Sequence, residues 1–302
     1  MKIGFLACPE TMPAAGTSSG VERRGDAFEH DLQVDALRPA FAAAGLELIE
    51  IEWRAPLDQF ADIRLVLIGT SWDYQDYPDE FLIKLEALQS VGVIVCNSPE
   101  LIRWNIDKSY LKELERRGTR TIPTLWSDDP DYGDVTRALA HFKSDKVVVK
   151  RQTGAGALGQ HIFDKESLPD EDWQMGHKAM IQPFLAAIQD EGELSFVFID
   201  GAFSHAIQKT TAKDEYRIQS LYGGQETAIT PSDDDIAAAL SVLQALPGDT
   251  PLYARIDMLR ADTEDSDGAL VVMEAEAIEP FLYPVQGPEL GKRMADAIIA
   301  RL

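Results

Sequence analysis

The first hundred residues alternate between short apolar runs and longer amphipathic stretches. Residues 2–7 form an apolar run that predicts a strand, and similar runs follow at 46–51, 63–68 and 93–96. A helix is predicted before Gly45, where Leu32, Leu37, Ala40, Phe41 and Ala44 recur at near-helical spacing, and another at 79–90. Such alternation is typical of a parallel sheet covered on both faces. We therefore predict a Rossmann-like domain over residues 1–98.

The pattern changes after Asn97-Ser98-Pro99, and the next part of the chain is mixed. Helices are predicted from about Asp107 to just before Gly118 and at 135–142. A buried strand is expected at 147–149, a glycine-rich loop at 154–159 and a further apolar strand at 179–184. We predict a small second domain over 99–184.

The last part, 185–302, has the pattern of antiparallel strands. Two apolar segments, 194–199 and 202–209, flank Asp200-Gly201, which is a strong hairpin signal. The remaining expected elements are strands at 217–221, 252–259 and 269–275, and helices at 233–246 and 288–302. The predicted class is α/β, with α+β character in this third domain.

Composition narrows the functional classes. No apolar run reaches about 18 residues, so no membrane span is expected, and the beginning of the chain does not have the pattern of a secretory signal. We expect a cytoplasmic protein. Its two cysteines, Cys8 and Cys96, are too few for a disulfide framework or a four-ligand zinc site. The net charge of −23 repels phosphate backbones and argues against nucleic-acid binding.

The segment 154–159 has the spacing of a dinucleotide-binding loop, GxGxxG. That fold requires a helix directly after the loop, whereas the residues from Gln160 to Phe163 alternate like a strand and Pro169 follows. We therefore reject a dinucleotide site. A glycine-rich loop between two strands can instead cover a triphosphate, with its backbone N–H groups donating to the phosphate oxygens. The alternative is that the loop is a plain hairpin turn.

Charged residues at strand ends and within late strands are the candidate chemical groups. Lys150 ends an apolar strand just before the glycine loop, where its ammonium either reaches a phosphate or is simply exposed. Glu274 and Glu276 share one face of a strand, and Asp257 can join them from a neighbouring strand. Three such carboxylates favour a cation such as Mg²⁺ unless some of them face solvent. Arg255, on the face of Asp257, could neutralise a transferred phosphoryl group.

The order of these groups resembles the ATP-grasp superfamily: a lysine, a second lysine before a glycine loop, a hinge, then Asp and Glu-x-acidic on two late strands. The resemblance covers essentially the whole chain and is to the glutathione synthetase and RimK-type branch. Trp72-Asp73-Tyr74, the segment 104–111, Pro123-Thr124 and Ile278-Glu279-Pro280 are similar to the subgroup that includes the cycloserine-forming cyclo-ligase.

The resemblance implies a role for each matching residue. Lys108 and Lys150 would contact the ATP phosphates, under a mobile loop that includes Gly154, Gly156 and Gly159. Gln182, Pro183 and Phe184 would pair with adenine through their backbone, and Glu193 would lie near the ribose. Lys209, Arg217 and Arg255 would line the transferred phosphoryl group and the substrate. Asp257, Glu274 and Glu276 would hold Mg²⁺, with Mn²⁺ as an alternative.

The implied activity is an ATP-dependent ligase that activates a small, amino-acid-like carboxylate as an acyl phosphate and joins it to an amine or another nucleophile, within the same molecule or in a second one. The alternatives are a phosphotransferase and an ATP-binding regulatory protein without ligase activity. A homodimer is compatible with the resemblance. Two departures concern the site: Glu276 stands where the family usually has Asn, and Gly69-Thr70-Ser71 replaces an expected arginine.

Overall fold

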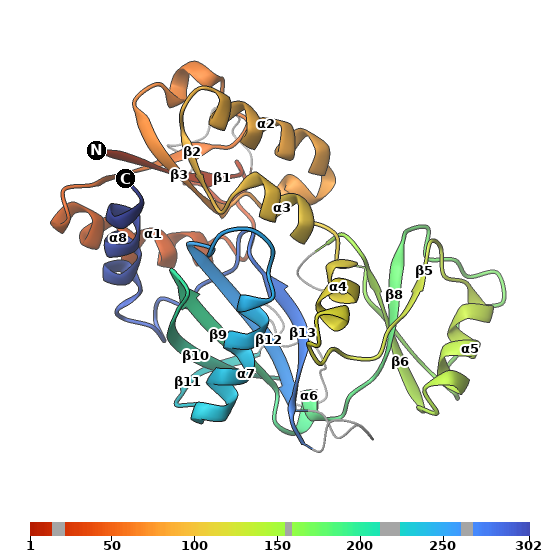
Figure 1. Ribbon diagram of the computed structural model, residues 1–302. Helices are drawn as coiled ribbons and strands as arrows, with labels where there is room; N and C mark the ends of the chain where they lie inside the picture. Colours follow the sequence, from red (N-terminus) through yellow and green to blue (C-terminus); the bar gives the residue numbers. More distant parts are fainter. Residues whose placement is uncertain (14–21, 155–158, 212–223, 261–267) are drawn as a thin grey trace.

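The chain is built from three sheets, one after another along the sequence (Figure 1). A computed structural model describes residues 1–13, 22–154, 159–211, 224–260 and 268–302. The mixed α/β class predicted from the sequence is confirmed. Within the described ranges, no helix has both the length and the apolar character needed to cross a membrane.

The first sheet is parallel, as predicted, with the strand order β2-β1-β3-β4. Its strands are β1 (Lys2–Ala7), β2 (Glu47–Glu52), β3 (Ile63–Thr70) and β4 (Ile94–Cys96). The helical segments of this part are α1 (Phe28–Ala43), η2 (Leu57–Phe60), η3 (Trp72–Asp76) and α2 (Pro78–Ser90). Because η3 directly follows β3, it places the Trp-Asp-Tyr motif at the carboxyl edge of this sheet.

The second sheet, β5-β8-β6-β7, is antiparallel. It consists of β5 (Leu125–Ser127), β6 (Lys146–Arg151), β7 (His161–Asp164) and β8 (Ala179–Pro183), with α5 (Tyr132–His141) packed against it. The segment after the glycine-rich loop is therefore the strand β7, as predicted, and not the helix that a dinucleotide site requires.

The helix predicted from about Asp107 to just before Gly118 is α4 (Tyr110–Arg116), which begins three residues later than predicted. A second short helix before it, α3 (Pro99–Asn105), was not predicted. Ser98 begins α3 by accepting a hydrogen bond from the backbone N–H of Leu101 at 3.3 Å. Between the helices, the carboxylate of Asp107 accepts from the N–H of Ser109 at 2.8 Å, a local bond that competes with helical pairing. Lys108 consequently lies on a turn.

The third sheet is antiparallel with the order β11-β10-β9-β12-β13. Its strands are β9 (Glu193–Ile199), β10 (Ala202–Thr210), β11 (Gln225–Ile229), β12 (Tyr253–Arg260) and β13 (Leu270–Glu276). The helices of this part are α6 (Ala187–Asp190), α7 (Asp233–Gln244) and α8 (Leu290–Arg301). The Asp200-Gly201 hairpin is confirmed, and both residues have positive φ, 50° and 77°. The strand expected at 217–221 lies outside the described residues.

One hydrophobic core joins the first sheet to the third. It contains Phe41 of α1, Val197 of β9, Tyr253 of β12 and Met294 of α8. The last helix packs so closely on α1 that a Cβ at Gly291 would lie 2.3 Å from the carbonyl oxygen of Ala36. This core contains residues from both sides of position 98. The division into domains at 98 and 184 stays a prediction.

Candidate active site

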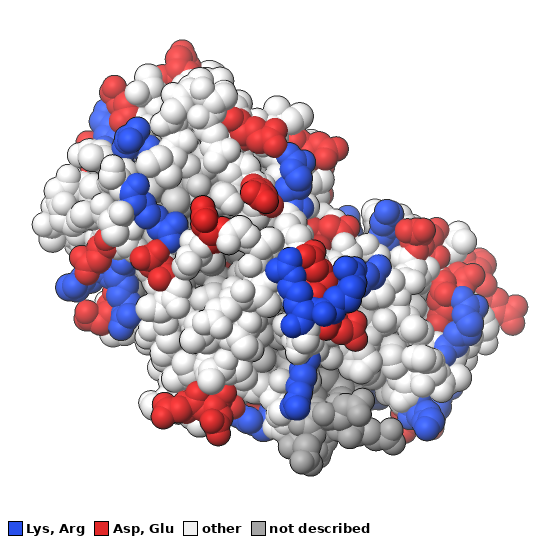
Figure 2. Space-filling model, viewed as in Figure 1, with Lys and Arg blue, Asp and Glu red and all other residues white. Residues whose placement is uncertain are grey.

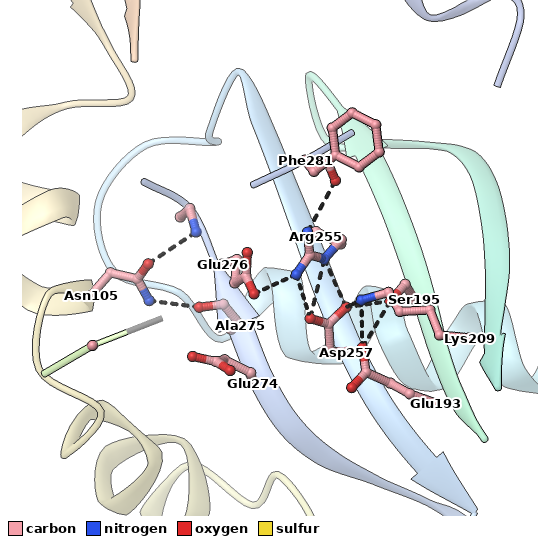
Figure 3. A network of polar contacts seen from close by, with 12 residues as sticks. Asn105, Glu193, Ser195, Lys209, Arg255, Asp257, Glu274, Ala275, Glu276 and Phe281 are labelled. Carbon is pink, nitrogen blue, oxygen red and sulfur yellow. Dashed lines mark hydrogen bonds and ion pairs between the residues drawn. The ribbon is translucent and has the colours of Figure 1, made fainter. Parts of the chain in front are cut away.

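The predicted metal carboxylates lie on one face of the third sheet (Figure 3). Asp257 of β12 pairs in register with Glu274 of β13, and Arg255 pairs with Glu276. Residues directly opposite in an antiparallel pair project to the same side, and so do residues two apart in one strand. The sequence alone placed Glu274 and Glu276 together, and the register now adds Asp257 and Arg255.

Each of these carboxylates has a cationic partner in the protein itself. The guanidinium of Arg255 donates from Nε to Oδ1 of Asp257 at 2.9 Å and from Nη2 to Oδ2 at 2.9 Å. It also forms an ion pair with Glu276. The ammonium of Lys108 lies 2.7 Å from Oε1 of Glu274 and donates to the carbonyl oxygen of Gly154. In this state the face is neutralised by its own cations.

Lys209 of β10 extends this network below the surface. Its Nζ lies 2.6 Å from Oε1 of Glu193 and 3.7 Å from Oδ1 of Asp257. The hydroxyl oxygen of Ser195 lies 2.5 Å from the same oxygen of Asp257 and 3.2 Å from Oε1 of Glu193, so its single proton is shared between these two acceptors. Lys209, Glu193 and Asp257 are all buried, with at most 5% of each residue exposed. Buried charges of this kind are stable only as a paired set.

The pKa values follow from burial and pairing. Burial alone would raise the pKa of Asp257, but Arg255 and Lys209 outweigh it and hold this pKa well below its usual range. Burial raises the pKa of Glu193 in spite of Lys209, and it raises that of Glu276 in spite of Arg255. Burial opposes the charged form of Lys209, yet the neighbouring carboxylates raise its pKa above the ordinary value. Asp257 therefore stays ionised and Lys209 stays protonated at neutral pH.

Side chains from the α3–α4 region fix the edge strand β13. Asn105 donates from Nδ2 to the carbonyl oxygen of Ala275 at 2.8 Å and accepts from the N–H of Ala277 at 2.9 Å. The hydroxyl of Tyr110 accepts from the N–H of Ala275 at 2.9 Å. An edge strand would otherwise leave these backbone groups unpaired. Because Glu274 and Glu276 flank Ala275, these bonds set the position of both carboxylates.

The other predicted ATP-binding residues are distributed around this face. Lys150 is half-buried at the end of β6, where burial lowers the pKa of its ammonium and the carboxylate of Glu274 partly compensates. The side chain of Gln182 donates to the hydroxyl of Thr124 at 3.0 Å, and the N–H of Phe184 donates to the carbonyl of Lys146 at 2.9 Å. These two donors are thus already used within the protein.

Three further predicted positions have different outcomes. Gly156 and Arg217 lie outside the described residues. Gly159 has a φ of +67°, in the region that favours glycine. Pro183 pairs in register with Val147 at the end of β8. The carboxylate of Glu193 contacts Lys209 and Ser195, so its placement beside a ribose stays a prediction.

Three residues of the site were missed by sequence reasoning. Ser195 occupies an ordinary strand position, and nothing local indicates that its hydroxyl bridges two carboxylates from different strands. Asn105 and Tyr110 lie in the segment 104–111, which resembles the subgroup, but the pattern assigns them no chemistry. A buried Asn beside the end of a helix was the one available signal, because such an amide must find backbone partners.

Among the described residues, no three Asp, Glu, His or Cys side chains are arranged to hold a metal ion as they stand. The donor set nevertheless fits a hard divalent cation, because Asp257, Glu274 and Glu276 offer only carboxylate oxygens on one face. Arg255 and Lys108 now hold these oxygens. A metal would take the place of the two cations, which would then be available to phosphate oxygens.

On the face shown in Figure 2, basic side chains gather mainly over α4, next to acidic ones. No continuous basic surface crosses this face.

Comparison with known proteins agrees with this geometry. Residues 3–97 match the family model described as the N-terminal domain of D-cycloserine synthetase DcsG. The cycloserine biosynthesis protein DcsG of Streptomyces lavendulae is 25% identical over 291 residues, which cover 90% of this chain and 94% of that protein.

Two solved structures extend the comparison. The crystal structure of D-cycloserine synthetase DcsG has a TM-score of 0.80 at 22% identity, covering 100% of this chain and 99% of that one. D-alanine–D-alanine ligase from Bacillus anthracis, complexed with ATP, has a TM-score of 0.65 at 19% identity, covering 99% and 96%. The chain therefore has the ATP-grasp fold, and it is similar to DcsG over most of its length.

Proposed function

We propose that this ATP-grasp ligase converts the carboxylate of a small amino-acid-like substrate into an acyl phosphate and then joins the acyl group to an amine-type nucleophile. The observation that carries the proposal is the set of alternating cations and carboxylates on the face of β12 and β13. Arg255 and Lys108 lie against Asp257, Glu276 and Glu274 there. A triphosphate with its divalent cation carries the same two kinds of charge. The phosphates can pair with Arg255 and Lys108, and the divalent cation can pair with the carboxylates.

The residues that would hold the nucleotide come from the second and third sheets. Lys108 and Lys150 would bind phosphate oxygens, with Gly154, Gly156 and Gly159 covering them. Gln182, Pro183 and Phe184 would lie along the adenine, and Glu193 toward the ribose. Asp257, Glu274 and Glu276 would hold Mg²⁺, or Mn²⁺ in its place. A bound cation would offset the negative charge of the transferred phosphoryl group.

In the first step, a carboxylate oxygen of the substrate attacks the γ-phosphorus of ATP, and the bond to the β,γ-bridging oxygen breaks to release ADP. In the second step, the nucleophile attacks the acyl carbon, loses a proton and displaces inorganic phosphate. Arg255 and Lys209, with Arg217, would neutralise the phosphoryl group and orient the substrate. Exclusion of water by the glycine loop would protect the acyl phosphate from hydrolysis.

A small substrate is supported by charge and by the dimensions of the site. The net charge of −23 repels polyanions as a whole, while Lys209 and Arg255 remain as local cations for one carboxylate. The pocket beside Lys108 and Glu274 is small and lined by side chains of both the first and the third sheet regions. Such a site suits a compact molecule more than a macromolecule.

The test is ADP release with ATP and either Mg²⁺ or Mn²⁺, measured against a panel of amino acids, dipeptides and hydroxy acids. We expect ADP release to depend on both the divalent cation and one small carboxylate. The variant Arg255→Lys should lose this ADP release. Product mass separates the two outcomes of the second step: ring closure uses one substrate and loses water, whereas ligation joins two. ADP release stimulated only by a protein, and by no small carboxylate, would contradict the proposal.

A further inference from the structure

Two sequence motifs without a role in the chemistry above meet at one pocket. Tyr74 belongs to Trp72-Asp73-Tyr74 in η3, and Glu279 belongs to Ile278-Glu279-Pro280 after β13. Both line the small pocket that also contains Lys108, Glu274 and Glu276. Its volume of about 30 Å³ has room for a group the size of a water molecule or an ammonium. It thus has the dimensions of a subsite for one functional group.

Glu279 differs from the other carboxylates of the site in its partners. Glu274, Glu276, Asp257 and Glu193 each form an ion pair with Lys108, Arg255 or Lys209. Among the ion pairs of the described residues, none includes Glu279. Its neighbour is the hydroxyl of Tyr74, and burial raises the pKa of its carboxyl group to about 7 because Lys108 and Arg255 compensate only in part. A carboxylate in this position is stabilised by an added cation.

Both groups are held in place by their own surroundings. The N–H of Tyr74 donates to the carbonyl of Ser71 at 2.9 Å, and the Tyr74 ring centroid lies 5.2 Å from that of Phe81. The residue before Glu279, Ile278, is buried, and its carbonyl oxygen accepts from the hydroxyl of Tyr253 at 3.0 Å. A carboxylate and a phenol oxygen are thereby preorganised on one pocket wall, which lowers the cost of ordering them on binding.

We propose that Tyr74 and Glu279 form a subsite for a protonated amine of the substrate, with Glu279 as the counterion and the Tyr74 oxygen as a second acceptor. This inference rests on the proposed function and specifies its substrate class as one that carries an ammonium group near the carboxylate to be activated. Glu274 and Glu276 are assigned to the divalent cation, so Glu279 is left to the organic cation. Tyr74 brings the first sheet into substrate recognition.

The test measures binding by calorimetry at neutral pH, with Mg²⁺ and a non-hydrolysable ATP analogue present. The probes are D- and L-alanine and, as matched compounds with a hydroxyl in place of the ammonium, D- and L-lactate. We expect one alanine enantiomer to bind roughly ten- to a hundredfold more tightly than the corresponding lactate. Glu279→Gln, which keeps the size and a hydrogen bond to Tyr74, should abolish this preference without changing the affinity for the nucleotide analogue.

The control is Glu115→Gln, at an exposed position of α4, which should behave as the wild type. Tyr74→Phe should lose part of the preference, since it removes one acceptor and retains the carboxylate. The inference is wrong if the wild type does not distinguish alanine from lactate, or if Glu279→Gln still does. A titration with Mg²⁺ alone that is weakened by Glu279→Gln would also overturn it, by making Glu279 a metal ligand. Failure of the nucleotide analogue to bind, with the alanine preference retained, would count against the proposed function alone.

Discussion

Replacing Lys209 by Met tests whether the buried charges under the site stabilise one another. Lys209 is 5% exposed, and its ammonium lies 2.6 Å from Glu193, which is 2% exposed. Methionine fills a similar volume and removes the charge. Among the described residues, Asp257 would keep Arg255 and Ser195 as partners, whereas Glu193 would keep only the hydroxyl of Ser195. The whole cost should therefore fall on Glu193.

Breaking a buried pair by removing one partner costs about 3–5 kcal/mol of unfolding free energy. Part of this cost disappears when Glu193 takes up a proton, because burial already raises the pKa of its carboxyl group. A carboxyl whose folded pKa lies above the unfolded value, which is about 4.3, contributes stability that is fully present below that value. This stability is lost as the pH rises through the folded pKa. The deficit of Lys209→Met relative to the wild type should therefore be small near pH 5 and approach the full cost near about pH 8.

The assay is urea unfolding of wild type and variants at both pH values, followed by circular dichroism. Lys209→Met with Glu193→Gln should regain more than half of the loss, because the second change removes the stranded charge. The control is Lys165→Met, whose partner Asp145 is exposed, and its unfolding curve should overlay that of the wild type. A loss below about 1 kcal/mol for Lys209→Met at the higher pH, or no recovery in the double variant, would refute the reasoning.

Three further predictions concern single positions. Glu274→Gln should lower ADP release at least about a hundredfold, because it removes a ligand of the divalent cation. A coupled assay of ADP checks this, and retained turnover would rule out that role. Burial and the nearby Glu226 raise the pKa of Glu29, on α1, to about 7. The variant Glu29→Gln should therefore have the same free energy of unfolding as the wild type near about pH 5 and be more stable by about 1–2 kcal/mol near about pH 8. Equal melting temperatures at both pH values would contradict this. Ser195→Ala should cost about 1–2 kcal/mol in urea unfolding, since its hydroxyl bonds two buried carboxylates, and a neutral effect would show that water replaces it.

Much of the fold was readable from the sequence because local pattern and tertiary position agree. The strand at residues 2–7 and the hairpin at Asp200-Gly201 follow directly from apolar runs and turn residues, and both are confirmed. The helix predicted from about Asp107 begins three residues later, at Tyr110, and the helix α3 before it was not predicted. The turn between the two helices depends on the carboxylate of Asp107 accepting a hydrogen bond from the N–H of Ser109, which the apolar spacing does not reveal.

The shared face of the carboxylates in the candidate site was predictable from the sequence, but the side chains that pair with them were not. The i and i+2 spacing of Glu274 and Glu276 requires that they share a face, whatever the rest of the fold does. That Asp257 lies opposite Glu274 depends on strand register, and the register is set by packing across the whole sheet. Ser195 and Asn105 could not be assigned, because their partners come from strands far away in the sequence.

The pairing of charges also connects stability with ligand binding. In the described structure Lys108 and Arg255 satisfy the carboxylates that a divalent cation would need. A cation entering alone would release both basic groups without a counterion, and a nucleotide entering alone would strand the carboxylates. Either event leaves partly buried charges uncompensated, which costs several kcal/mol. When nucleotide and cation enter together, every group changes partner and none is stranded. The ion pairs that stabilise this face would therefore favour binding of ATP together with its metal over binding of either component alone.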